Sequence, residues 1–341
     1  MAFNIDTCKI LVWGMKDSYQ THSHIHEGFF RAAKHMRPNS LWLDDEGGDQ
    51  TNLDWDNTLV ITEHGPAKNP RLPVRDGVFY VVHGMNDDAA CRERFQNVKN
   101  RLSWNVFHDY SHVYGTQGNP VNGYSIGVPL TDVMWIGEDT PLYPNENHMD
   151  FRWATDLLPH EIEANKPTQW LGQGSKVIWY VGTQWWVNQT ELNHFKKACD
   201  DAGIEFKPTG AGQQPTDSRH PLWGRRVATI EENVRMVRES LMGPAISGTH
   251  HLTEGYVPCR IFKNISYGHY GVTNNLRANQ VLESKCIYNP DPYKLFYEAR
   301  ERLQCKPLSE LHALMDLVKE KHTYVNRINM ILKAARIITE R

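Results

Sequence analysis

Short apolar runs alternate with amphipathic stretches through the first half of the chain. Compact apolar runs bounded by turn residues are typical of buried strands, and apolar residues spaced three or four positions apart are typical of helices. We predict strands at residues 9–13, 41–43, 58–62, 78–82, 105–107 and 133–136, and helices at 25–36 and 88–102. Strands of this kind, separated by helices, indicate a parallel sheet that is covered on both faces.

The same alternation restarts after an irregular stretch at residues 139–174. We predict strands at 176–181 and 204–208, and helices at 188–202, 229–241, 292–303 and 309–338. The sequence therefore predicts the α/β fold class, with two Rossmann-like domains that face a central cleft. We assign residues 1–165 to the first domain, 166–320 to the second, and 321–341 to a C-terminal helix that we expect to pack back on the first.

Residues 249–275, THHLTEGYVPCRIFKNISYGHYGVTNN, contain the strongest candidate for a ligand site. Pro258 suits the first turn of a helix and Gly268 suits its end, so we predict a helix at 259–267, followed by a strand at 270–273. The apolar face holds Ile261, Phe262 and Ile265, and another face holds Arg260, Lys263, Asn264 and Tyr267. Unpaired N–H groups at the helix start, reinforced by Arg260, favour a phosphate, whereas a solvated helix face is the alternative.

The composition and charge exclude several classes of protein. Hydrophobic residues at 40% and charged residues at 23% are ordinary for a globular protein, and a net charge of −3 gives no general attraction to nucleic acid or to anionic membranes. The six cysteines include no CxxC pair, which argues against a zinc module and predicts free thiols in a reducing compartment. Neither a signal peptide nor a run of eighteen apolar residues is seen, so we expect a cytoplasmic protein without a transmembrane segment.

Two motifs in the second half carry a family resemblance. Glu254-Gly-Tyr-Val-Pro258 and the helix from Arg260 to Gly268, followed by a short strand and by a Tyr-Lys-Leu helix after Asn289-Pro-Asp, resemble the donor half of GT-B glycosyltransferases. The resemblance is to the glycosyl transferases family 1 group and its CgeB-like branch, and it covers residues 229–336. It implies a UDP- or GDP-linked sugar as donor, a glycan or other hydroxyl compound as acceptor, and no metal or other cofactor.

The resemblance also implies where the donor binds. In this family an acidic residue and the helix after it line the nucleotide-sugar pocket, and Glu254 occupies that acidic position. The second glutamate of the family pattern, which holds the donor ribose, is missing, because Phe262 stands at the matching position. The glycine turn after the strand at 176–181 would approach the diphosphate from the opposite side. The expected donor-binding residues are Gly182, Thr183, His250, Glu254, Arg260, Lys263, Asn264 and Tyr267.

Candidates for a catalytic base lie in the first half of the chain and beside the donor motif. By the same resemblance, the loop at 14–26 occupies the position where GT-B proteins meet the acceptor. It contains Asp17 and the histidines His22, His24 and His26, whose i, i+2, i+4 spacing matches no known metal site. A histidine or carboxylate there would serve as general base, and His251 stands near the expected donor site. We expect His26, Asp17 or His251 to be catalytic, with loop or core roles as the alternative.

Two other functions stay open from the sequence. A nucleotide-sugar epimerase of the same architecture would form its product without any acceptor. A non-catalytic protein that binds a nucleotide or a sugar is consistent with the missing second glutamate, and it would neither hydrolyse nor transfer the donor sugar. The sequence shows no basic stripe of the kind that binds nucleic acid. A metal-independent glycosyltransferase of glycan biosynthesis is therefore the expected function.

Overall fold

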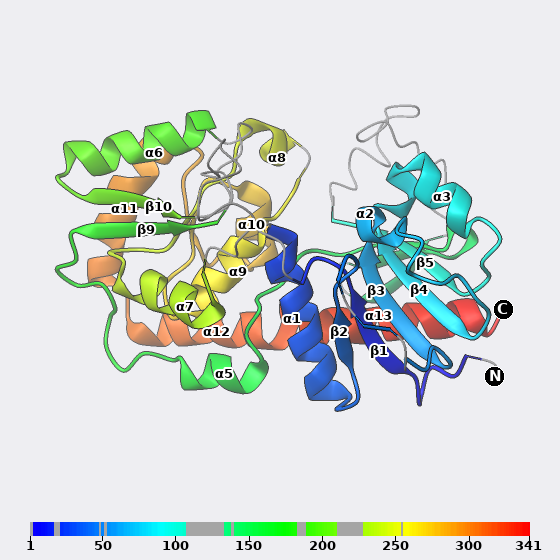
Figure 1. Cartoon of the computed structure of the whole chain (residues 1–341). Coiled ribbons are helices and arrows are strands. Elements are labelled where there is room, and N and C mark those ends of the chain that lie inside the picture. The colour runs from blue at the N-terminus through cyan, green and yellow to red at the C-terminus, as the bar shows by residue number, and fades with distance from the viewer. Residues whose placement is uncertain are drawn as a thin grey trace. The chain divides into compact units, whose positions relative to one another are not determined.

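The computed structural model describes residues 3–16, 21–47, 49–50, 53–106, 133–137, 140–182, 189–209, 228–253 and 255–341. The chain divides into two compact units. Unit 1 comprises Met1–Asp17, His22–Arg152 and Val325–Arg341, and unit 2 comprises Ser18–Thr21 and Trp153–Tyr324. Each unit combines parallel strands with helices, so the chain has the predicted α/β fold class (Figure 1).

The division of the chain differs in detail from the expected one. The main boundary lies between Arg152 and Trp153, and the predicted boundary at 165 therefore falls inside unit 2. Helix α5, Pro159–Ala164, precedes that predicted boundary and belongs to unit 2. The C-terminal residues Val325–Arg341 belong to unit 1.

Unit 1 is built on one eight-stranded sheet. Its strands are β1 (Lys9–Trp13), β2 (Leu41–Leu43), β3 (Thr58–Glu63), β4 (Val78–His83), β5 (Arg101–Asn105), β6 (Met134–Gly137), β7 (Thr140–Tyr143) and β8 (His148–Asp150). The order is β2-β1-β3-β4-β5-β8-β7-β6, and all pairs are parallel except β8 with β7 and β7 with β6. The carboxyl ends of β1, β3, β4, β5 and β8 therefore lie along one edge of the sheet.

In the described residues of unit 1 the α-helices are α1 (Thr21–Met36), α2 (His64–Ala67), α3 (Ala89–Phe95) and α13 (Tyr324–Thr339). The first residue of α1 and the first residue of α13 belong to unit 2. Large aromatic side chains fill the core of the unit. Trp104 stacks on Phe151 with ring centroids 4.3 Å apart, and the Phe29 ring meets both edge-on. Full burial of each such side chain contributes about 1.5–3 kcal/mol, which explains why apolar runs predict these strands well.

Unit 2 contains two small parallel sheets. One pairs β10 (Glu205–Thr209) with β9 (Val177–Val181), and the other has the order β11 (Pro244–Ala245), β12 (Val272–Thr273), β13 (Ile287–Tyr288). Its other helices are α6 (Gln189–Asp201), α7 (Ile230–Glu239), α8 (Thr249–Thr253), α9 (Cys259–Ser266), α10 (Leu276–Val281), α11 (Pro292–Cys305) and α12 (Leu308–Lys321). Helix α7 is capped at its start, because the Thr229 side chain accepts from the Glu232 N–H and the Glu232 carboxylate accepts from the Thr229 N–H.

Three predicted elements are wrong in extent. The helix predicted at 88–102 ends at Phe95, because the extended residues Arg101–Asn105 pair with β4 and β8 as strand β5. The helix predicted at 309–338 is broken after Lys321, where the His322 carbonyl accepts from the Thr155 N–H at 3.0 Å. In both cases contacts distant in sequence override a local helical pattern.

The third error concerns the polar loop predicted at 14–26. Helix α1 begins at Thr21, so the histidines at 22, 24 and 26 are helical. His22 and His26 are thereby one turn apart and share a face. The polar first turn carries no apolar pattern that would mark it as helix.

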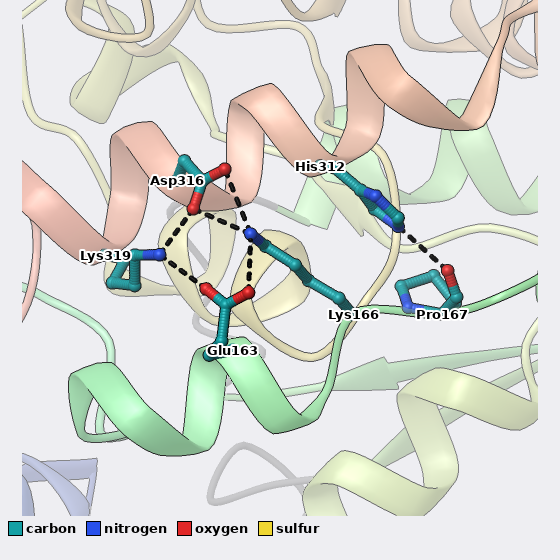
Figure 2. A network of polar contacts seen from close by, with 6 residues as sticks. All are labelled: Glu163, Lys166, Pro167, His312, Asp316 and Lys319. Carbon is teal, nitrogen blue, oxygen red and sulfur yellow. Dashed lines mark hydrogen bonds and ion pairs between the residues drawn. The ribbon is translucent and has the colours of Figure 1, made fainter.

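Helices α5 and α12 of unit 2 are joined by a four-residue charge network (Figure 2). Lys166 Nζ lies 2.8 Å from Asp316 Oδ1 and 2.9 Å from Glu163 Oε1. Lys319 Nζ lies 2.6 Å from the same Asp316 oxygen and 2.5 Å from Glu163 Oε2. Beside it, His312 Nε2 donates to the Pro167 carbonyl at 2.8 Å. These contacts hold the chain after α5 against α12.

Replacing Lys319 by methionine is expected to lower the free energy of unfolding by about 0.5–1 kcal/mol at low salt. The value is small because Glu163 is 53% exposed and Asp316 is 36% exposed, so water screens the pairs. Urea unfolding at low and high sodium chloride measures the loss, which should shrink with salt. Lys294→Met, on a 74% exposed side chain, is the control. A loss that does not depend on salt would contradict an electrostatic role.

Two further expectations, on the cysteines and on membrane-spanning helices, can be compared with the structure. All six cysteines are free thiols, as predicted. Across the ranges that the structure describes, no helix combines the length and the apolar character that crossing a bilayer requires.

Candidate functional site

Arg260, the second residue of α9, is fixed at the carboxyl end of β9 in unit 2. Its Nε donates to the Val181 carbonyl at 2.8 Å, and its Nη1 donates to the Tyr180 hydroxyl. The guanidinium carbon lies 3.9 Å from the centroid of the Tyr180 ring. Tyr180 is itself fully buried, and its hydroxyl donates to the Ile246 carbonyl at 3.1 Å. The guanidinium is thus held by protein groups before any ligand arrives.

Gly182 lies directly against this guanidinium. The glycine has φ of +131°, and a Cβ added to it would stand 2.4 Å from Arg260 Nη2. Any other residue would meet both the strained backbone conformation and the arginine. The structure therefore brings together Gly182 and Arg260, two of the predicted donor-binding residues. Thr183, the next residue of the predicted turn, lies outside the described residues.

His251 belongs to the same neighbourhood. Its ring stacks on that of Tyr256, with centroids 4.5 Å apart and an interplanar angle of 27°. Burial, aided by the positive charges of His250 and Arg260, lowers the pKa of His251 to about 4. An imidazole with so low a pKa is neutral at pH 7 and is a weak proton acceptor. This favours a binding role over the predicted catalytic one. His250 is exposed, and Glu254 is not among the described residues.

The remaining predicted residues of α9 are engaged inside unit 2. Lys263 Nζ lies 2.7 Å from Asp156 Oδ2, and the Tyr267 hydroxyl donates to Asp156 Oδ1 at 2.7 Å. Asn264 is 4% exposed, and its Nδ2 donates to the Pro244 carbonyl at 3.3 Å. The polar face of α9 therefore meets protein groups after its first turn. Binding roles for Lys263, Asn264 and Tyr267 stay predictions without a local contact that supports them.

A polar network that sequence reasoning missed supports the loop after β11. Asn274 Oδ1 accepts from the Ser247 N–H at 2.8 Å, and Asn274 Nδ2 donates to the Ser247 carbonyl at 2.8 Å. Asn275 Nδ2 donates to the Tyr256 carbonyl at 2.8 Å. The network fixes both ends of the segment that carries α8 and His251. The sequence feature that could have indicated this network is the Asn-Asn pair directly after the strand at 272–273.

Unit 1 presents a second cluster around Glu63, the last residue of β3. The carboxylate contacts His22 through Oε2, while Oε1 lies 3.7 Å from His83 Nδ1 and 4.0 Å from His26 Nε2. The histidines come from α1 and from the end of β4. Sequence reasoning missed Glu63 and His83, although each is a polar residue that ends an apolar strand. That position is where open α/β sheets bind ligands.

Burial and the charge of Glu63 affect the pKa values of these histidines differently. Burial works against ionisation of Glu63, but His22 and His83 hold the pKa of this carboxylate well below its usual range. Burial alone would lower the pKa of His22, and the charge and hydrogen bond of Glu63 reverse the effect and raise it. Burial lowers the pKa of His26, whose Nδ1 donates to the Gly14 carbonyl at 2.8 Å. Asp17 lies outside the described residues.

Within the parts of the chain that the structure describes, no three His, Cys, Asp or Glu side chains are arranged to hold a metal ion. No family model matches the sequence, and no curated protein matches it. Among solved structures, the chain is similar to an alpha,alpha-trehalose-phosphate synthase (UDP-forming) from Burkholderia xenovorans, at 12% identity and a TM-score of 0.46, covering 92% of this chain and 78% of that one.

Two further structures are similar to the same degree. The synthase from Burkholderia multivorans has 12% identity and a TM-score of 0.44, with 94% of this chain and 77% of that chain covered. The UDP-forming synthase from Burkholderia vietnamiensis has 10% identity and a TM-score of 0.43, with 94% and 76% covered. These identities and scores do not assign a family to the chain.

Proposed function

We propose that the chain is a glycosyltransferase that takes a sugar from a UDP- or GDP-linked donor and transfers it to a glycan or other hydroxyl acceptor. Unit 2 binds the donor, and no divalent metal or other cofactor is needed at the diphosphate. The observation that carries the proposal is the Arg260 guanidinium, fixed over Gly182 at the carboxyl end of β9.

The chemistry of the leaving group explains why this arrangement suits a donor diphosphate. Glycosyl transfer releases a nucleoside diphosphate, whose growing negative charge must be balanced by donors already in place. A guanidinium forms paired hydrogen bonds with phosphate oxygens and keeps its charge at all relevant pH values. A glycine lets the backbone approach the phosphates closely. Arg260 and Gly182 supply both features at the sheet edge where α/β proteins bind ligands.

Replacing Arg260 by alanine is expected to weaken the binding of UDP or GDP about 10- to 100-fold, because one charge-assisted contact to phosphate is lost. Isothermal titration calorimetry with both nucleotides measures the change and shows which base is preferred. Arg235→Ala, which removes an exposed arginine of α7, is the matched control and should leave the affinity unchanged. Equal affinity of the Arg260 variant and the wild type would contradict the proposed site.

Gly182→Ala provides a second variant of the same site, since its Cβ would displace the arginine without removing its charge. Thermal unfolding of each variant shows that a loss of affinity is not a loss of fold. Incubation of the wild type with UDP- and GDP-sugars, with and without a panel of hydroxyl acceptors, tests the reaction itself. Product without acceptor would indicate an epimerase, and binding without any turnover would indicate a non-catalytic protein. Either result would reject the transferase proposal.

A further inference from the structure

Tyr180, the fourth residue of β9, connects the two sheets of unit 2. It is fully buried, and its ring packs against Phe206 of β10 with the ring centroids 5.6 Å apart. Its hydroxyl donates to the Ile246 carbonyl at 3.1 Å, directly after β11. Because β9 and β11 belong to different sheets, this hydrogen bond joins the carboxyl end of one sheet to the carboxyl end of the other.

The carbonyl that accepts from Tyr180 lies on a fixed stretch of main chain. Ser247, the next residue after Ile246, is held on both sides by the Asn274 side chain, which binds its N–H and its carbonyl, each at 2.8 Å. The Ile246 carbonyl is therefore an acceptor in a defined place. A hydroxyl group carries a single proton, so once that proton is donated to Ile246, the Tyr180 oxygen can only accept from other donors.

Arg260 donates to this oxygen. Its Nη1 donates to the Tyr180 hydroxyl, its Nε donates to the Val181 carbonyl at 2.8 Å, and its guanidinium carbon lies 3.9 Å from the centroid of the Tyr180 ring. Two of these three contacts come from the Tyr180 side chain, and the third comes from the main chain, which a substitution does not remove. A long side chain loses rotamer freedom when it binds a ligand, and this loss weakens binding unless the fold has already ordered the side chain.

We propose that Tyr180 is a positioning residue, which holds Arg260 in the orientation that meets the diphosphate of the donor. The inference rests on the proposed function, in which Arg260 and Gly182 bind those phosphates. Tyr180 does not touch the ligand and acts through the guanidinium. Its hydroxyl fixes Nη1, its ring lies against the guanidinium, and its bond to Ile246 ties this arrangement to the second sheet. The affinity for the diphosphate therefore depends on a buried hydroxyl group that the ligand does not contact.

Calorimetric titration of the full chain with UDP and GDP tests this role. Tyr180→Phe keeps the ring and removes the hydroxyl, and we expect it to weaken binding of the preferred nucleotide about 3- to 10-fold, the usual contribution of one hydrogen bond. Tyr270→Phe is the matched control, since Tyr270 is also buried, its hydroxyl donates to the Lys285 carbonyl at 2.8 Å, and Lys306 Nζ lies 4.6 Å from its ring centroid. The control should leave the affinity unchanged. Thermal unfolding of both variants verifies that they are folded.

A variant that conserves the charge separates positioning from a purely structural role. Arg260→Lys keeps the positive charge but has no Nη1 for the tyrosine to fix, so adding Tyr180→Phe to it should change the nucleotide affinity by less than about twofold. A structural role of Tyr180 would cause the same loss in both backgrounds. In turnover with the preferred donor and acceptor, Tyr180→Phe should lower kcat by more than it raises the KM for the donor, because the diphosphate gains negative charge as it leaves.

Two results would overturn the positioning role and leave the transferase standing. One is equal nucleotide affinity of Tyr180→Phe and the wild type, while Arg260→Ala binds more weakly. The other is an equal loss from Tyr180→Phe in the arginine and lysine backgrounds. A wild type that binds neither UDP nor GDP would overturn this inference together with the proposed donor site.

Discussion

Replacing Lys263 by methionine is expected to lower the free energy of unfolding by about 3–5 kcal/mol, the usual cost of removing one partner from a buried ion pair. Lys263 is 13% exposed and lies 2.7 Å from Asp156, whose side chain is fully buried. Without the lysine, the carboxylate loses the positive charge that offsets its removal from water. Urea unfolding followed by circular dichroism measures the change.

A double variant isolates the cause of this loss. Asp156→Asn removes the buried charge, so Lys263→Met combined with it should be more stable than the sum of the two single losses predicts. Lys196→Met, at a 48% exposed position of α6, should change stability by less than about 0.5 kcal/mol. Unchanged stability of Lys263→Met together with weaker UDP or GDP binding would instead assign Lys263 to the donor, as the sequence predicts.

The stability of unit 2 is expected to fall by about 3 kcal/mol between pH 6.5 and pH 4 through His269 alone. This residue follows Gly268 after α9 and is 3% exposed. Burial lowers its pKa from 6.5 to about 4 in the folded protein. Between these values the unfolded chain binds a proton that the folded chain does not. Stability is therefore highest above pH 6.5 and decreases as pH falls through this window.

Other groups titrate in the same range, so the effect of His269 is read as a difference between proteins. The pKa of His26 is also lowered, and that of His251 is about 4. Urea unfolding at pH 7, 6 and 5 should give a shallower pH dependence for His269→Gln than for the wild type. His194→Gln, at an exposed position of α6, should keep the wild-type slope. Parallel slopes for His269→Gln and the wild type would contradict the prediction.

Polar residues of α9 that the sequence grouped together make different contacts in unit 2. In the structure, Arg260 at the start of α9 reaches the end of β9, whereas Lys263 and Tyr267 reach Asp156. The sequence placed all three on one polar face, because residues three and four apart are neighbours on a helix. It could not show that Asp156, distant in the chain, meets that face. Periodicity predicts which side chains lie on the same face of a helix, and it does not predict which residues contact that face.

The prediction of catalytic residues is limited in the same way, because the sequence does not show which distant residues lie near them. The histidines at 22–26 made this segment a candidate, and His26 was the one named among the expected catalytic residues. The structure instead buries His26 and leaves His22 partly exposed beside Glu63. Nothing local links α1 to the end of β3. A search for polar residues that end apolar strands would have added Glu63 and His83 to the candidates.

The sequence by itself determined the α/β class, most strands of both units and the bounds of α9 to within one residue. These features depend on local spacing of apolar, proline and glycine residues, which act over a few neighbouring positions. Only the tertiary structure decided that 101–105 is a strand, that the last helix breaks after Lys321, and that Arg260 rather than Lys263 meets Gly182. Such outcomes depend on partners far along the chain, whose contact energies exceed local propensity.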